Sequence, residues 1–361
     1  FPIKYLVKYL VKYLFKYLAG IIAPLIIFLA VSGDILGAPG QSAPEQSPAG
    51  PTFGSQSVLK TCWTQEELRG RPNEKKAGRP AASDETIPVK DRPEFRPTPL
   101  PREWHNCIRR VNPGHRAKVV ALTFDLCQGP HGRAGYDAEI VDYLRQHQIK
   151  ATFFAGGKWM VDHPARTMQL MADPLFELGN HTWSHANLRV GRGKKIEDEI
   201  IRTQVEYELL RQELVAKSVI RGVSQAELDK IPRRMMVFRF PYGACDAESL
   251  SVTAKLGLAA IQWDVVTGDP DKSQSAHKIV DIILSRTRPG SIIIGHANGR
   301  GHGTAEALPV VIPELQRRGY TFVTVSELLR LGQAVATEEC YELTPGDNYR
   351  YDRSAGREVV P

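Results

Sequence analysis

The segment VVALTFDLC, residues 119–127, decides the fold. Its first six residues are apolar or β-branched, as in a strand that is buried on both faces of a parallel sheet, and the carboxylate Asp125 follows at once. Six further segments of this kind occur downstream. The expected strands are 119–124, 151–155, 176–180, 236–240, 259–263, 291–295 and 321–325.

Helical patterns separate these strands. Segment 137–148 places Ile140, Val141 and Leu144 on one face, and segment 196–218 also repeats apolar residues at helical spacing. Strands that alternate with helices favour a parallel sheet, so the sequence predicts an α/β protein with a barrel of about seven parallel strands.

The composition is that of a soluble globular protein. Of 361 residues, 42% are hydrophobic and 24% are charged. The formal net charge is +7, but residues 1–38 hold four Lys and one Asp, so the remaining 43 basic and 39 acidic residues leave +4. No stripe of basic and aromatic residues occurs, which argues against nucleic acid as a partner.

Four segments are expected along the chain. Lysine tetrads followed by a short apolar run predict a signal peptide or membrane anchor at 1–38, and therefore a periplasmic or secreted protein that could stay anchored in the membrane. Residues 39–110 are rich in Pro and Gly and predict a linker or irregular arm, in which the part around Cys62 and Trp63 docks on the main domain. The main domain is expected at 111–332, with a polar C-terminal tail at 333–361.

Five motifs stand where predicted strands end, and the carboxyl ends of barrel strands are where such folds collect catalytic groups. They are TFDLC at 123–127, HTWSH at 181–185, RFPYG at 239–243, WDVVTGD at 263–269 and IIIGH at 292–296.

The HTWSH motif carries His181 and His185 at a spacing that brings two imidazoles to one side of a helical turn. Two such imidazoles can hold one divalent ion. The alternative is a pair of surface or packed histidines.

The other motifs supply acid, base and donor groups. A buried carboxylate at Asp125 needs a partner or a task, and the fixed fork of Arg239 suits it. The Pro-Tyr-Gly turn can present the backbone N–H of Tyr242. His296 precedes a small, flexible segment, as suits a proton donor, and Asp269 could hydrogen-bond its imidazole. A structural ion pair, a core histidine and a turn aspartate are the alternatives.

From about residue 118 to 329 the chain resembles the NodB-homology polysaccharide deacetylases, carbohydrate esterase family 4. The resemblance rests on LTFD, YDAEIVDYLRQHQIKATFFAGG, GNHTWSH, RFPYG, GSIIIGH and RRGYTFVTVSELL in this order. It implies a distorted (β/α) barrel, a divalent metal that is often zinc, and hydrolysis of an N-acetylated glycan of the cell envelope. The implied roles are metal ligation by His181 and His185, general base for Asp125, its partner for Arg239, an oxyanion N–H for Tyr242, general acid for His296 and support of that acid for Asp269.

Two motifs depart from the family. The family has a second, metal-binding acid after the first motif's aspartate, where this chain has Leu126, so Asp137, Asp125 or Cys127 could substitute. In the fourth motif, Pro270 follows Asp269 where the family has a tryptophan. A metal-independent amide hydrolase and a catalytically inactive glycan-binding domain are the alternatives to the metal-dependent deacetylase.

Five cysteines fit an exported protein with one or two disulfides. A Cys127–Cys245 disulfide is favoured, because both cysteines follow motifs at the rim, and Cys127 as a metal ligand is the competing use. Pairing of Cys62 with Cys107 or Cys340 is also open.

Overall fold

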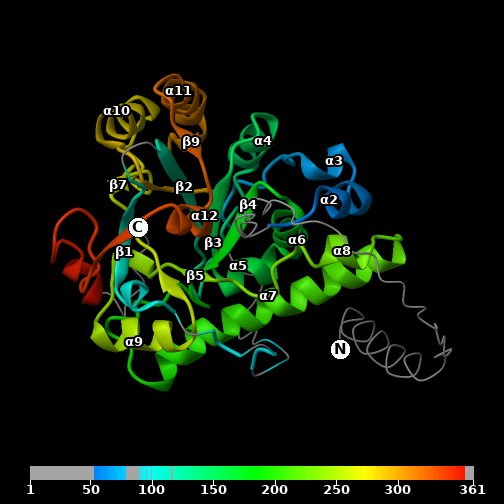
Figure 1. Ribbon diagram of the computed structural model, residues 1–361, viewed down its shortest axis with the longest axis horizontal. Helices are drawn as coiled ribbons and strands as arrows, with labels where there is room; N and C mark the ends of the chain where they lie inside the picture. Colours follow the sequence, from blue (N-terminus) through cyan, green and yellow to red (C-terminus); the bar gives the residue numbers. More distant parts are fainter. Residues whose placement is uncertain are drawn as a thin grey trace, which may run out of the picture. The chain divides into compact units, whose positions relative to one another are not determined.

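A curled sheet of parallel strands forms the centre of the fold, with helices outside it (Figure 1). The predicted distorted (β/α) barrel is therefore confirmed. All seven predicted strands are present, several of them shorter than expected. Three strands in the described part of the chain were not predicted: β7 in this sheet, and β1 (Cys107–Asn112) and β10 (Gln333–Thr337), which form a separate two-stranded sheet. In order across the sheet the strands are β6 (Ala259–Ala260), β5 (Val237–Phe238), β4 (Phe176–Asn180), β3 (Ala151–Ala155), β2 (Val119–Leu126), β8 (Ile292–His296) and β7 (Val265–Val266), while β9 (Thr321–Phe322) pairs with β2 off this path.

This computed structural model describes residues 53–78, 88, 90, 92–94, 96–98, 100–114 and 117–353. All of them belong to one unit, Gly50–Pro361. The predicted signal peptide or anchor at 1–38 lies outside the described residues. Within the described part of the chain, no helix combines the length and the apolar character needed to cross a membrane.

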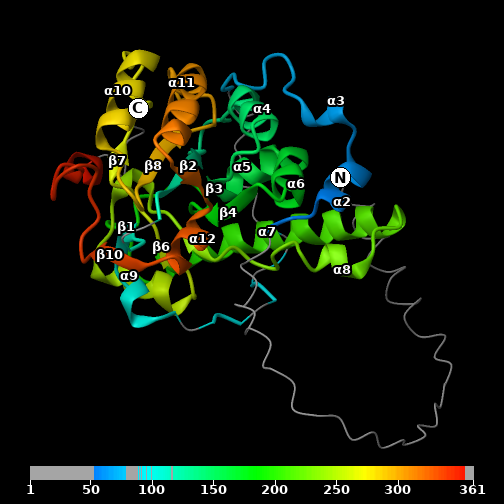
Figure 2. The ribbon, with the colours of Figure 1, turned by 45° about the horizontal axis from the view of Figure 1, so that its top comes forward.

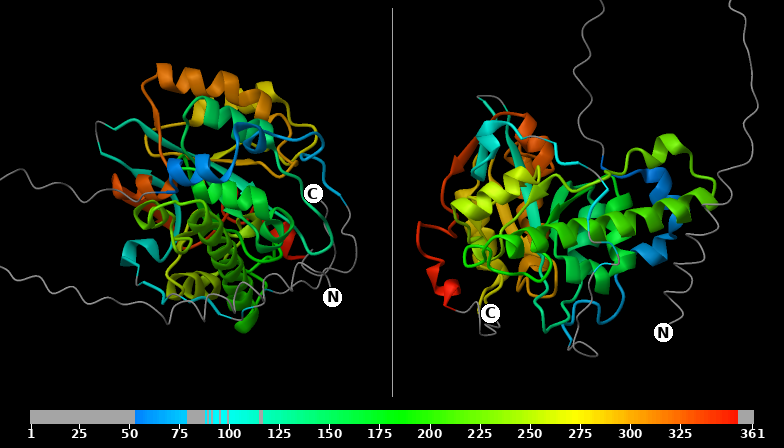
Figure 3. Two further views of the ribbon diagram at one scale, coloured as in Figure 1. Left: turned by 90° about the vertical axis from the view of Figure 1, so that its right-hand side faces the viewer. Right: turned by 90° about the horizontal axis from the view of Figure 1, so that it is seen from below.

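Helices of the strand–helix units cover the outside of the sheet. The long helix α7 runs across the side of the molecule that faces the viewer in the right-hand view of Figure 3, and α10 and α11 lie side by side in Figures 1 and 2. The helices are α4 (Ala138–Gln146), α5 (Gly157–Asp162), α6 (Pro164–Ala172), α7 (Lys194–Ile220), α8 (Gln225–Leu228), α9 (Ala247–Lys255), α10 (Ala276–Arg286), α11 (Thr304–Arg317) and α12 (Val325–Arg330).

Strand β2 contributes to two hydrophobic cores, one between the sheet and the outer helices and one inside the barrel. All eight of its residues are buried. The even-numbered residues from Val120 to Leu126 pack with the outer helices, whereas Val119 and Ala121 pack with strand residues inside the barrel. Because side chains alternate along a strand, the inward series continues through Thr123 to Asp125 at the carboxyl end.

The N-terminal arm contains two short helices, α2 (Gln56–Cys62) and α3 (Gln65–Leu68). Helix α2 packs against α6 and α7, and Cys62 and Trp63 are buried in the main core. The ammonium group of Lys217 lies 4.2 Å from the centroid of the Trp63 ring. The predicted docking of this part of the arm is therefore confirmed.

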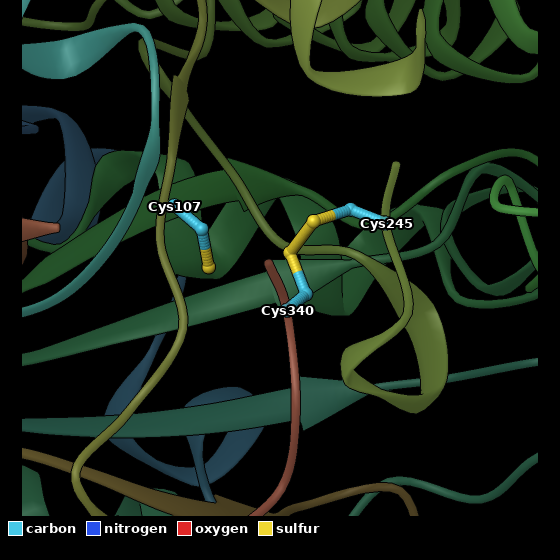
Figure 4. Close-up of side chains that lie close together, drawn as sticks. All are labelled: Cys107, Cys245 and Cys340. Carbon is cyan, nitrogen blue, oxygen red and sulfur yellow. A yellow bond between two sulfur atoms is a disulfide. The ribbon is translucent and has the colours of Figure 1, made fainter. Parts of the chain in front are cut away.

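The described part of the C-terminal tail, residues 333–353, is structured. Strand β10 (Gln333–Thr337) pairs antiparallel with β1 (Cys107–Asn112). Beyond β10, a disulfide joins Cys340 to Cys245, with the free Cys107 beside it (Figure 4). The favoured Cys127–Cys245 disulfide is therefore wrong, and so is pairing of Cys62 with Cys107 or Cys340, since Cys62, Cys107 and Cys127 are all free. Sequence spacing could not reveal that the tail returns to the Cys245 loop.

Removal of the disulfide should destabilise the fold. The two cysteines are 95 residues apart in sequence, so their bond restricts a long loop of the unfolded chain. We expect the double variant Cys245→Ala, Cys340→Ala to lose about 2–4 kcal/mol of unfolding free energy in urea titrations. Both cysteines are replaced because Cys107 lies within reach of either sulfur. Thiol counting on the denatured, unreduced parent protein should give three thiols, and a mapped Cys127–Cys245 peptide would contradict the structure.

Candidate active site

Four of the predicted site residues continue inward-facing series of the strands. Asp125 ends such a series in β2, His181 directly follows β4, Arg239 directly follows β5 and His296 ends β8. In the parallel pairing of β2 with β8, Asp125 and His296 are direct partners. The alternation of strand side chains therefore brings these residues together at the carboxyl ends of neighbouring strands.

The carboxylate of Asp125 forms a buried ion pair with Arg239. Arg239 Nη1 donates to Asp125 Oδ1 at 2.8 Å, and both side chains are almost fully excluded from solvent. The guanidinium also donates to the carbonyls of Ile261 and Gln262 and lies over the ring of Phe154. The contact predicted between Asp125 and Arg239 is present, and Asp125 Oδ2 remains on the side of His181, 3.6 Å from Nε2.

The histidine pair lies in a loop instead of the predicted helical turn. Thr182 and His185 have φ values of 63° and 58°, a left-handed conformation that non-glycine residues adopt at a cost and that clusters at functional sites. The two imidazole centroids are nevertheless only 5.0 Å apart. The left-handed residues of this loop thus bring the two imidazoles together, as the sequence spacing had predicted for a helical turn.

Cys127 joins this pair. Its Sγ lies 3.4 Å from His181 Nε2, and the donor atoms of Cys127, His181 and His185 all lie within 4.8 Å of one another. Burial alone would raise the pKa of the Cys127 thiol, but the imidazoles of His185 and His181 lower this pKa well below its usual value. Burial alone would lower the pKa of the His181 imidazole, but the charges of Asp125 and Cys127 raise this pKa above its ordinary value.

These three groups fit a divalent metal of the zinc type. Thiolate and imidazole are the donors that zinc prefers in proteins. His181 donates its Nδ1 proton to the carbonyl of Arg239 at 2.9 Å, which directs the lone pair of Nε2 toward Cys127. By contrast Asp137, considered above as a substitute ligand, forms an ion pair with Lys75 at 3.1 Å and does not join this group.

His296 and Asp269 form the predicted pair. His296 Nδ1 lies 2.8 Å from Asp269 Oδ1, and Asp269 also accepts from the backbone N–H of His296 and from the hydroxyls of Thr267 and Thr304. Burial alone would lower the pKa of His296, but the Asp269 carboxylate raises it well above the ordinary value. The replacement of the family's tryptophan by Pro270 therefore leaves this contact intact.

The Tyr242 turn is supported by tail residues that the sequence did not single out. Tyr242 has a φ of 60°, and its ring contacts those of His185 and Tyr351. The buried amide of Asn348 donates to the carbonyl of Tyr242 at 3.1 Å and also to that of Gly243. No local signal in the tail marks these residues, because their partners lie more than a hundred positions earlier.

Asn298 is a further residue that the sequence did not single out. It is fully buried after β8 and its Nδ2 donates to the carbonyl of Cys127 at 2.9 Å. The hydrogen bond fixes the backbone where Cys127 leaves β2. A polar residue two positions after His296 was the only available hint.

A carboxylate and a histidine on neighbouring strands, beside a group of side chains that can bind a metal, are typical of the active site of a hydrolase. Comparison with known proteins identifies the family. The model of the family described as polysaccharide deacetylase matches residues 112–261. The chain is 32% identical to a peptidoglycan-N-acetylglucosamine deacetylase of Bacillus cereus over 213 residues, which cover 58% of this chain and 68% of the relative.

Two further relatives agree. A chitooligosaccharide deacetylase of Bradyrhizobium sp. (strain ANU 289) is 30% identical over 58% of this chain and 90% of its own length. A crystal structure of a peptidoglycan N-acetylglucosamine deacetylase in complex with 4-naphthalen-1-yl-N-oxidanyl-benzamide superposes with a TM-score of 0.50 at 27% identity, covering 65% of this chain and 99% of that one. The chain belongs to the polysaccharide deacetylase family. It is an enzyme, a hydrolase of amide C–N bonds, in a family whose members generally depend on a metal ion.

The Asp125–Arg239 ion pair should be a strong determinant of stability. Arg239→Met leaves a buried carboxylate without its partner, and we expect it to cost about 3–5 kcal/mol of unfolding free energy in urea. The double variant Arg239→Met, Asp125→Asn should cost less, because the buried charge is also removed. Arg317→Met is the matched control, since Arg317 pairs with Glu314 at the surface and its loss should change stability little. Equal costs for the single and double variants would contradict a buried ion pair.

Proposed function

We propose that this protein removes acetyl groups from N-acetylated amino sugars in a polysaccharide or oligosaccharide of the cell envelope. The observation that carries the proposal is the direct pairing of Asp125 with His296 beside the histidine pair. A base and an acid on opposite sides of a scissile amide can manage both proton transfers of its hydrolysis. The relatives named above as peptidoglycan and chitooligosaccharide deacetylases support the same class of substrate.

Asp125 is proposed as the general base. Arg239 holds Oδ1, so Oδ2 is the oxygen that faces the site and accepts a proton from the attacking water. The ion pair fixes the carboxylate in orientation, as a base needs at the moment of attack.

His181 and His185 are proposed to hold the metal. When bound there, a divalent ion of the zinc type supplies Lewis acidity, which polarises a carbonyl and makes a water molecule more acidic. The hydrogen bond from His181 Nδ1 to the Arg239 carbonyl fixes the ring for this task.

His296 is proposed as the general acid. Its Nδ1–H is held by Asp269, which leaves Nε2 to deliver a proton to the departing amine as the C–N bond breaks. The products are acetate and the free amino sugar. The backbone N–H of Tyr242 is the proposed donor to the oxyanion, because the left-handed turn at this residue orients its amide.

Action outside the cytoplasm is part of this proposal. The basic and apolar segment at 1–38 has the layout of an export signal or anchor. The Cys245–Cys340 disulfide independently favours an oxidising compartment such as the periplasm.

A metal-independent amide hydrolase is the second candidate, and one group of side chains favours it. Donor atoms of Asp125, Cys127 and His296 lie within 4.8 Å of one another, and Asp269 holds the other side of the imidazole. A thiol, an imidazole and a carboxylate in series can act as an activated nucleophile.

Loss of the base or the acid should abolish most of the turnover. We expect Asp125→Asn and His296→Ala each to lower acetate release from N-acetylglucosamine oligomers by about two to four orders of magnitude. Asp271→Asn and His277→Ala are matched controls of the same chemistry at exposed positions and should leave the rate unchanged. Full activity in either site variant would remove the role assigned to that residue.

Metal removal separates the two candidate functions. We expect the purified protein to hold about one zinc-type ion per chain, to lose acetate release after chelation and to regain it when zinc returns. His181→Ala should lose both the ion and the activity. Undiminished acetate release from metal-free protein would favour the metal-independent hydrolase.

A further inference from the structure

The metal-type donor group contains a residue that the family pattern does not supply. The second acid of the family's first motif is Leu126 here, and Cys127 follows it. Within the part of the chain that the structure describes, one group of three potential ligands contains both His181 and His185, and Cys127 completes it.

In this chain, strand alternation points Leu126 and Cys127 in opposite directions. Leu126 ends the outward series of β2 and is fully buried in the core between sheet and helices. In this chain the side chain at position 126 therefore points away from the histidine pair. Cys127 is two residues after Asp125, so its side chain points to the same side as the base and reaches the histidine pair.

The distances fit a shared ion. Tetrahedral zinc, with bonds of about 2.3 Å to sulfur and about 2.0 Å to nitrogen, holds these two donors roughly 3.5 Å apart. The separation of Cys127 Sγ from His181 Nε2 is 3.4 Å. The backbone of Cys127 is fixed by Asn298 and the ring of His181 by the carbonyl of Arg239, so the donors are oriented in advance.

The alternative donors are engaged elsewhere. Oδ1 of Asp125 is held by Arg239, its Oδ2 is the oxygen proposed above to act as the base, and Asp137 is paired with Lys75. The disulfide partner once expected for Cys127, Cys245, is bonded to Cys340. Cys127 therefore remains a free thiol with 7% of its surface exposed. It lies beside His185, the one residue of the three potential ligands that is partly exposed to solvent.

We propose that Cys127 binds the catalytic metal as a thiolate and completes a Cys-His-His site with His181 and His185. This inference rests on the metal site of the proposed function. A thiolate makes the site selective for thiophilic ions such as zinc, cobalt and cadmium, and a poor site for magnesium, calcium and manganese, which favour oxygen ligands.

Cobalt spectroscopy tests the sulfur ligand directly. The metal-free full-length protein is titrated with Co²⁺ without oxygen, and the unsubstituted protein should develop a near-ultraviolet thiolate-to-cobalt charge-transfer band. Cys127→Ser and Cys127→Asp should lack this band, while Cys127→Asp should still bind cobalt through oxygen and nitrogen. Cys62→Ala, which removes a free buried thiol outside the site, is the matched control and should keep the band.

Zinc affinity gives a second readout, measured by competition with a chelating dye. Loss of second-shell partners alone weakens metal sites about 10–100-fold, so Cys127→Ser should weaken zinc binding at least about 100-fold. An unchanged cobalt spectrum and unchanged zinc affinity in Cys127→Ser would overturn the proposal.

Thiol protection keeps the test valid if the substituted proteins do not fold. In the unsubstituted protein, zinc should slow modification of Cys127 by a small thiol reagent, read by peptide mapping, and leave the rates at Cys62 and Cys107 unchanged. Equal modification of Cys127 with and without zinc would overturn the proposal.

Failure of the proposed function can be distinguished from failure of this inference, because cobalt spectra, zinc affinity and thiol modification are all measured without the deacetylation reaction. A protein that shows the charge-transfer band but releases no acetate would keep Cys127 as a ligand and refute the deacetylase. Acetate release that Cys127→Asp retains in part, and that chelation then abolishes, would argue for a metal ligand at position 127 and against a thiol nucleophile there, because a carboxylate can replace a thiolate as a zinc ligand.

Discussion

The buried guanidinium of Arg239 is the contact on which the rest of the site depends. Its side chain pairs with Asp125 from β2, donates to two carbonyls that follow β6 and lies over Phe154 from β3. Its backbone N–H donates to Asn180 at the end of β4, and its carbonyl accepts from His181. A charge buried this deeply is tolerated only when it is paired and hydrogen-bonded, so the fold must bring these strand ends together in one arrangement. The proposed base, Asp125, and one proposed metal ligand, His181, are therefore positioned by the same residue.

Much of this arrangement could be predicted from the sequence, because it follows from the period of two along buried strands. Apolar runs precede Asp125, Arg239 and His296. Each run predicts a strand, and it also determines to which side of the sheet the residue at the end of that strand points. Parallel connection through helices then places those ends at one edge of the sheet. The Asp125–Arg239 and His296–Asp269 contacts were expected from the chemistry of these side chains, and both are present. The roles assigned to these residues remain predictions until the variants are measured.

The remainder depends on long-range or strained backbone that no local pattern encodes. HTWSH has the spacing of a helical turn, but left-handed conformations at Thr182 and His185 bring the imidazoles together instead. Such conformations are imposed by the surrounding packing and not by residue preference. The sequence of the C-terminal tail is polar and contains no recognisable motif, yet Asn348 and Tyr351 contact the Tyr242 turn. Their partners are determined only once β10 has paired with β1, which is a tertiary event.

The same tail determines which thiol stays available at the site. Cys245 follows the Tyr242 turn by three residues, and in an oxidising compartment a cysteine so near the rim would compete for Cys127. Its bond to Cys340 removes that competitor and anchors the tail where Asn348 can hold the turn carbonyls. One covalent link therefore serves two needs: it stabilises the strained turn that carries the proposed oxyanion donor, and it leaves Cys127 as a thiol. A site that uses sulfur in place of the family's carboxylate requires this separation, because a thiol lost to a disulfide can no longer bind a metal as a thiolate.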